Sequence, residues 1–142
     1  MLDWSPRIQV FVQGHRVARL ATVDSAGHPL VLPICYVLAG ETLYSPIDAK
    51  PKRVPVQRLK RLQNIQVNPH VALVIDDYSE DWTQLAHVIM HGTAEILTNG
   101  PAFDQAVAAL RRKYPQYQHM PIQDNPMIAV QLTRLVSWGT VR

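Results

Sequence analysis

Six cationic side chains fall within twelve positions of this sequence. They are Lys50, Lys52, Arg53, Arg58, Lys60 and Arg61. Lysine ammonium groups supply compact point charges, and an arginine guanidinium grips two phosphate oxygens with a planar pair of donors. The stretch 47–55, IDAKPKRVP, therefore has the composition of an anion site, and its two prolines keep it extended. On residue types alone, a solvated cationic turn explains the stretch equally well.

The position of the basic stretch favours the anion site. An apolar period of helical spacing over 54–66 predicts a helix directly after it, which Asn68 and Pro69 end. Free N–H groups and the helix dipole attract anions at a helix N-terminus. Arg58 and Arg61 are three positions apart, so we expect them to share one face of this helix.

Nucleic acid is a weaker match for the same cations. Nucleic-acid binding usually combines basic stripes with interleaved aromatic residues. Aromatic residues make up 7% of this chain, and none lies within 47–61. We find no helix-turn-helix or zinc-finger pattern, and we expect no nucleic-acid partner.

The other reactive residue types form no recognisable catalytic or metal motif. His87 and His91 are four apart, but the segment HVIMHGTAEIL is typical of a strand, so no metal site is expected. Cys35 has no evident base partner, and the acidic loop 76–81 lacks the spacing of a calcium loop. His87, His91 and Tyr36 remain as candidate proton donors, and no catalytic acid or base is assigned.

The elements that position these residues are mostly short strands. Ser5 followed by Pro6 predicts a helix start, and we expect a helix over 6–17. Three strands are then predicted at 18–24, 29–38 and 42–47, the first two joined by a turn that contains Gly27. Pro33 and Pro46 within these strands indicate an edge, a bulge or a place where a ligand meets the backbone.

The second half of the chain continues the same alternation. We predict strands at 70–76, 85–97 and 127–138 and a helix at 101–112, with Gly92 as a bulge. Six short strands and three short helices favour a mainly β fold, a six-stranded antiparallel barrel, over a doubly wound sheet. We find no linker, and we expect 1–142 to be one domain.

The whole-chain composition fits a soluble domain. The chain has 142 residues, 47% of them hydrophobic, and a formal net charge of +3. A single cysteine favours a reducing compartment, and no apolar run approaches the roughly 20 residues that cross a bilayer. We therefore expect a cytoplasmic protein without a signal peptide or a membrane segment.

The order of several short segments resembles a known family. ARLATVD (18–24), GHPLVLPICYVL (27–38), TLYSPIDAKPKR (42–53), RLQNIQVNPHVALVIDDY (61–78) and HGTAEIL (91–97) are similar to the split β-barrel flavin-type oxidoreductases. That family includes pyridoxamine-5′-phosphate-oxidase-like proteins and a coenzyme F-420-dependent group. The resemblance implies an FMN-binding split-barrel type of fold and a homodimer with two cofactor sites at its interface.

The resemblance also implies which residues hold the cofactor. Leu32, Pro33 and Ile34 would lie under the tricyclic ring, and the end of the third strand would contact the ring and ribityl chain through Ser45, Ile47 and Asp48. The phosphate would be held by cations among Lys50, Lys52, Arg53, Arg58 and Arg61. Trp82 and Trp138 would contact the ring or substrate from the second subunit, or would be interface core.

The function implied is hydride transfer between coenzyme F-420, a deazaflavin, and an unsaturated small molecule. The doubled basic cluster favours this cofactor over FMN, because its oligoglutamate tail adds negative charge. Two alternatives stay open: an FMN-dependent oxidase or reductase of the same fold, and a flavin- or haem-binding module without turnover.

Overall fold

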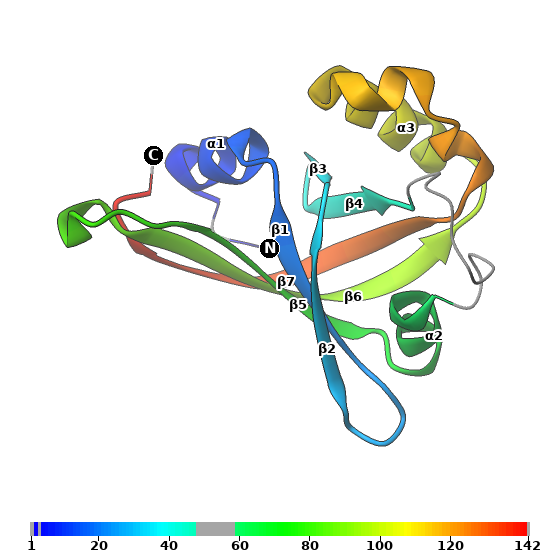
Figure 1. The fold of residues 1–142 in the computed structure, drawn as a ribbon, viewed down its shortest axis with the longest axis horizontal. Helices are drawn as coiled ribbons and strands as arrows, with labels where there is room; N and C mark the ends of the chain where they lie inside the picture. The colour runs from blue at the N-terminus through cyan, green and yellow to red at the C-terminus, as the bar shows by residue number, and fades with distance from the viewer. Residues whose placement is uncertain (1, 3, 48–58, 142) are drawn as a thin grey trace.

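The computed structural model describes residues 2, 4–47 and 59–141, and Figure 1 shows their arrangement. The seven strands are β1 (Ala18–Val23), β2 (Pro29–Ile34), β3 (Val37–Ala39), β4 (Thr42–Pro46), β5 (His70–Asp77), β6 (Ala86–Leu97) and β7 (Met127–Gly139). The helices are α1 (Pro6–Gly14), α2 (Lys60–Val67) and α3 (Pro101–Lys113), with short 3-10 turns η2 (Trp82–Gln84), η3 (Pro115–His119) and η4 (Ile122–Asp124).

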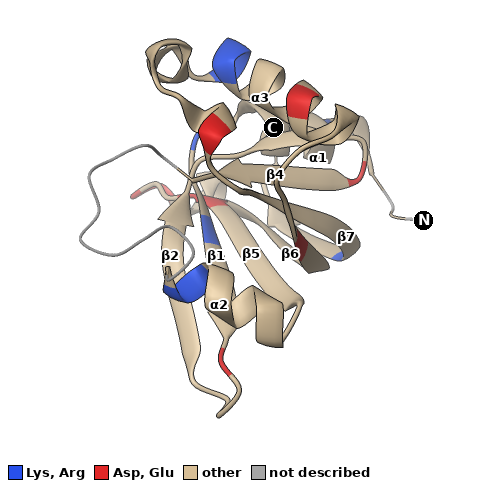
Figure 2. Cartoon of the chain, turned by 90° about the vertical axis from the view of Figure 1, so that its right-hand side faces the viewer, with Lys and Arg blue, Asp and Glu red and all other residues tan. Residues whose placement is uncertain are grey.

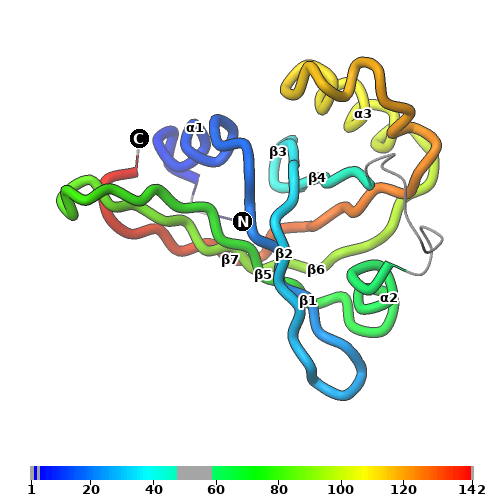
Figure 3. The backbone as a smooth tube through the Cα atoms, in the orientation of Figure 1, coloured from blue at the N-terminus to red at the C-terminus, as the bar shows by residue number. Residues whose placement is uncertain are grey.

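All strand pairs are antiparallel, and the sheet order is β2-β1-β5-β6-β7-β4-β3. The two strands at the ends of this order, β2 and β3, are consecutive in the chain and only Cys35 and Tyr36 separate them. The sheet must therefore curl until its two ends meet, and Figure 3 shows the chain running from β2 directly into β3. This closure makes the sheet a split barrel, as predicted.

The number of strands differs from the prediction. The run 29–38, predicted as one strand, is divided into β2 and β3, so the described sheet has seven strands and not six. At the break, the backbone N–H of Tyr36 donates to the hydroxyl of Tyr114 at 3.1 Å. A side chain from 78 positions away thus takes the donor that a continuous ladder would use.

β6 and β7 are long enough to reach from one end of the sheet to the other. Between His91 and Gly92 the register of this pair shifts, which confirms the predicted bulge at Gly92. A Cβ atom at Gly92 would lie 2.4 Å from the carbonyl oxygen of Gln131, so only glycine fits there. The bulge lets two long strands bend around the core.

Alternation along the strands separates a buried inner face from an exposed outer face. Ala86, Val88, Met90 and Ala94 of β6 point into the core, and the residues that alternate with them along the strand are half-buried or exposed. The main core also receives Phe11 and Val12 from α1 and Leu62 and Ile65 from α2. A second apolar cluster lies under α3. Its largest members are Phe103, Leu110, Tyr114, Tyr117, Ile122 and Met127.

The helix boundaries correct two predictions. α1 begins after Ser5, whose side chain accepts from the N–H of Ile8 at 3.2 Å, but it ends at Gly14 and not at residue 17. α2 begins at Lys60, later than predicted, because the N-cap Leu59 has a non-helical ψ of 134°. Arg58, which we predicted to share a helical face with Arg61, lies outside the described residues. No helix in the described part of the chain is long and apolar enough to span a membrane.

Candidate functional site

The segment Leu32–Ile34, predicted to lie under the cofactor ring and called the platform below, lies at an edge of the sheet. β2 pairs with β1 through Ala18–Ile34, Arg19–Pro33 and Leu20–Leu32, and it is the first strand in the sheet order. Pro33 is exposed, whereas Leu32 is half-buried and Ile34 is buried in the main core. The edge position predicted from Pro33 is confirmed. The Pro33 side chain is exposed at this edge of the sheet.

The end of β4 lies close to this platform because β3, which follows β2 in the chain, pairs with β4. Val37, three residues after Ile34, pairs with Tyr44, and Ser45 follows Tyr44 directly. Ser45 and Ile47 are both buried, and the Ile47 carbonyl accepts from the side-chain amide of Asn125 at 3.0 Å. Ile47 therefore supports the barrel wall with its side chain, and its carbonyl is bound by Asn125.

The described part of the basic stretch is the start of α2. Lys60 and Arg61 are the first two residues of this helix, which packs against β1, and Figure 2 shows its first turn in blue. The N-cap Leu59 has no side-chain acceptor for the first-turn N–H groups. The other predicted contacts lie outside the described residues: Asp48, Lys50, Lys52, Arg53 and Arg58.

Two contacts fix α2 against the β1–β2 hairpin. The side-chain amide of Asn64 donates to the hydroxyl of Thr22 at 3.0 Å, and both groups are buried. Lys60 Nζ lies 3.7 Å from a carboxylate oxygen of Asp24, which follows β1. The pKa of Asp24 is lowered, chiefly because its carboxylate accepts from the backbone N–H of His28. The cationic helix start is thus held at a set position against the Thr22–Asp24 end of the hairpin.

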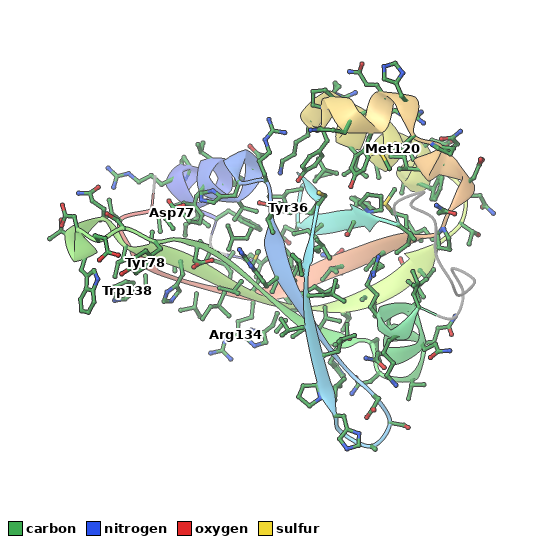
Figure 4. The ribbon with its side chains drawn as sticks, viewed as in Figure 1. Tyr36, Asp77, Tyr78, Met120, Arg134 and Trp138 are labelled. Carbon is green, nitrogen blue, oxygen red and sulfur yellow. The ribbon has the colours of Figure 1, made fainter. Side chains whose placement is uncertain are left out.

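The predicted aromatic contacts lie at the far end of the sheet. Trp82 in η2 is 71% exposed, and Trp138 on β7 is 54% exposed. The Trp138 ring stacks on His87 with centroids 5.5 Å apart, and Figure 4 shows Trp138 and Tyr78 at this end. Pro46 pairs with Met127 at the opposite end of β7, roughly 35 Å from Trp138 at about 3.3 Å per strand residue. Within one chain, Trp138 does not reach the end of β4.

Of the three candidate proton donors, Tyr36 is the least accessible. It is fully buried, its hydroxyl donates to the Val12 carbonyl, and burial raises its pKa well above the usual range. Tyr36 therefore serves the core. His87 and His91 lie on β6 with their side chains on the outer face, as predicted for a strand. No metal-binding group of three or more His, Cys, Asp or Glu side chains occurs among the described residues.

The sequence did not predict a cavity of about 580 Å³ that lies beside the link between β2 and β3. Its wall combines the link between α1 and β1, the link between β2 and β3, and the segment after α3. The lining includes Arg16, Cys35, Tyr114, Tyr117 and Met120. Figure 4 shows Met120 above the barrel on the α3 side. These residues are distant in sequence, and no local motif marks them.

The cavity has a cationic border. Arg16 lines it and donates to the carbonyl of Lys113, with its guanidinium 5.4 Å from the centre of the Tyr114 ring. Burial, with the nearby charge of Arg16, lowers the pKa of Lys113 to about 8. Burial also raises the pKa of Tyr114 to about 12. The Tyr114 hydroxyl lies 2.8 Å from the Arg16 carbonyl, which joins α3 to the end of α1.

Comparison with known proteins gives one family. The sequence pattern of the pyridoxamine 5′-phosphate oxidase family matches residues 5–139. A search of the curated proteins found no match.

Several solved structures share the fold. The conserved hypothetical protein Rv2991 from Mycobacterium tuberculosis is 20% identical with a TM-score of 0.77, over 96% of this chain and 85% of that one. The haem storage protein HutZ from Vibrio cholerae is 19% identical with a TM-score of 0.72, over 93% and 92%. A protein described as an F420 reductase is 22% identical with a TM-score of 0.63, over 85% and 89%.

Proposed function

The chain belongs to the pyridoxamine 5′-phosphate oxidase family, and on this premise we propose that it is a coenzyme F-420-dependent oxidoreductase. In this proposal it transfers a hydride between the deazaflavin and an unsaturated small molecule in the cytoplasm. The similarity to an F420 reductase supports the choice of cofactor. The observations that carry the proposal are the exposed Pro33 on the edge strand β2 and the basic start of α2, which is held against the β1–β2 hairpin.

The described residues fit such a cofactor. A flat ring can lie against Pro33, since that side chain is exposed on an edge strand. Lys60, Arg61 and the first-turn N–H groups of α2 suit a phosphate, because Leu59 offers no competing side-chain acceptor. The same arrangement suits FMN, whose ribityl phosphate carries the same charge.

When bound, the deazaflavin supplies a ring carbon that donates or accepts a hydride. The chain's own residues position it: β2 and β4 set the plane of the ring, and the cations hold its anionic end. Asn64 and Lys60 keep α2 at a fixed distance from β1, so the phosphate site and the ring site stay in register. None of the described residues is assigned as a catalytic acid or base.

We propose that the active form is a homodimer. The registers place Pro33, Arg19, Val74, Ile89 and Val136 in one row across five strands on the outer face. Val136 is 44% exposed, and Trp138 lies two residues further along the same face. A second copy laid on this face would bring its own tryptophans toward the Pro33 edge, which Trp138 of the same chain does not reach.

Cofactor titration tests the proposal. Purified protein is titrated with coenzyme F-420 and, separately, with FMN while the fluorescence of the cofactor is followed. We expect coenzyme F-420 to bind at micromolar concentration or below, and more tightly than FMN. Binding of neither cofactor at micromolar concentration contradicts the proposal, and a yellow protein purified with flavin favours the FMN alternative.

A haem-binding module without turnover is the second candidate. The similarity to HutZ, which covers 92% of that chain, is the observation that favours it. Addition of haem then produces a Soret band with a saturating endpoint, and no hydride reaches any acceptor. If the protein binds haem and binds neither coenzyme F-420 nor FMN, the result favours the haem-binding module.

A further inference from the structure

Packing alone does not explain the cavity between the α1–β1 link, the β2–β3 link and η3. Its volume of about 580 Å³ is within the range of small-molecule sites. Tyr117, Met120 and Pro115 give it apolar walls, and Met120 is adaptable in shape. Cys35 is half-buried in its wall and is the one cysteine of the chain. A flat, apolar molecule fits such walls.

The charges around the cavity are of one sign. None of the described residues that line it carries a carboxylate, and Arg16 is part of its wall. Lys113 Nζ lies 3.8 Å from the centre of the Tyr36 ring and 5.4 Å from that of Tyr114. This ammonium atom is buried, and it has no hydrogen-bond partner among the described residues. Arg16 and Lys113 are cations near each other, and the described wall holds no anion. This arrangement favours a ligand that brings a negative charge.

We propose that this cavity binds a small conjugated carboxylate, with the apolar body against Tyr117 and Met120 and the carboxylate on Arg16. A guanidinium pairs well with a carboxylate because its donors match the two oxygens. The cavity is a site distinct from the basic stretch, since Arg16 precedes β1 and Lys60 begins α2.

The role of the ligand rests on the proposed function. Cys35 follows Ile34 directly, and Leu32–Ile34 is the segment expected under the cofactor ring. A molecule in the cavity therefore lies beside that segment, and we assign it as the hydride acceptor. Its C=C bond would take a hydride from the reduced deazaflavin at one carbon and a proton from solvent at the other, so that the C=C bond becomes a single bond and the deazaflavin is oxidised. This names the substrate class as unsaturated carboxylates.

Cys35 gives a readout of binding that needs no cofactor and no turnover. The rate at which iodoacetamide alkylates Cys35 is measured by intact mass, with trans-cinnamate as the probe and trans-cinnamamide as its neutral isostere. We expect cinnamate to slow alkylation at least fivefold, with saturation, and the amide to have little effect at equal concentration. Isothermal titration should rank the two probes in the same order.

The charge requirement is tested with Arg16→Gln. We expect about tenfold weaker protection by cinnamate, with rescue by Arg16→Lys and no change in Arg112→Gln, an exposed cation on α3. Equal protection by both probes, protection by neither, or unchanged cinnamate binding in folded Arg16→Gln overturns the inference. Hydride transfer to cinnamate by the holoenzyme is then measured separately, so loss of cofactor binding alone leaves the cavity result standing.

Discussion

Gly92 shows how one residue sets the shape of the sheet. An added Cβ would lie 2.4 Å from the Gln131 carbonyl oxygen and 2.8 Å from a Val130 methyl group, both on β7. We predict that Gly92→Ala lowers the free energy of unfolding by about 1–3 kcal/mol, as overpacking usually does. Urea unfolding measures it. Gly14→Ala is the matched control, since nothing lies within 4 Å of its added Cβ, and equal stability of the two variants contradicts the prediction.

Lys113 makes stability depend on pH. Its pKa is lowered from 10.5 to about 8, mainly by burial. Between these values the unfolded chain binds more protons than the folded chain, so the free energy of unfolding rises with pH across that window. We predict that Lys113→Met removes this rise. The two proteins are compared by urea unfolding from pH 7 to 9.5.

Lys113 has charged and titratable neighbours that also affect stability at high pH. Arg16, Cys35, Tyr36 and Tyr114 face it, and both tyrosines have raised pKa values that lower stability only at higher pH. Taking the difference between the parent and Lys113→Met at each pH isolates the lysine, because the other groups are common to both. A difference that does not change between pH 7 and 9.5 contradicts the prediction.

At the scale of elements, α2 depends on one buried hydrogen bond. Asn64 and Thr22 are 2% and 3% exposed, and they bond to each other at 3.0 Å. We predict that Asn64→Ala costs about 1–3 kcal/mol of stability, since it leaves the Thr22 hydroxyl buried without this donor. Gln63→Ala, an exposed position on the same helix, should change little. Thr22→Val combined with Asn64→Leu should recover part of the loss, and a deficit as large as that of Asn64→Ala argues against this account.

The cations near α2 are the testable part of the phosphate site. Replacing Lys52 and Arg61 together by glutamine should weaken cofactor binding by well over tenfold, because charge-assisted contacts contribute roughly 1.5–3 kcal/mol each. The fluorescence titration used for the parent measures it. Arg7→Gln with Arg112→Gln removes the same charge from exposed positions elsewhere. If both double variants bind alike, the basic stretch is a solvated surface.

Local signals predicted most elements to within a residue or two. Alternation and turn residues are read from neighbours in sequence, so β5, β6, β7 and α3 fall close to their predicted ranges. The prediction of one strand over 29–38 was wrong, because the division into β2 and β3 depends on Tyr114, a distant partner. The cavity was missed for the same reason, since Arg16, Cys35 and Met120 meet only in the folded chain.

At the scale of the whole molecule, the outer face of the sheet exposes several large apolar side chains. Val31, Val136 and Trp138 are 64%, 44% and 54% exposed, and cross-strand pairing places them on the same side of the sheet as Pro33. Exposed apolar patches of this kind mark interaction sites. The same face carries the platform assigned to the cofactor ring, so assembly and cofactor binding are expected to depend on each other.

This coupling leads to a prediction on the assembly. The chain mass is 16.1 kDa, and light scattering after size exclusion should give about twice that value if the homodimer forms by mutual burial of the outer face. Val136→Asp places a charge in the middle of that face and should shift the protein to the monomer, with at least tenfold weaker binding of coenzyme F-420. Val10→Asp, an exposed valine on α1, is the matched control and should change neither quantity. A Val136→Asp variant that stays dimeric removes the outer face as the interface, and a monomer that binds the cofactor as tightly as the parent shows that one chain completes the site.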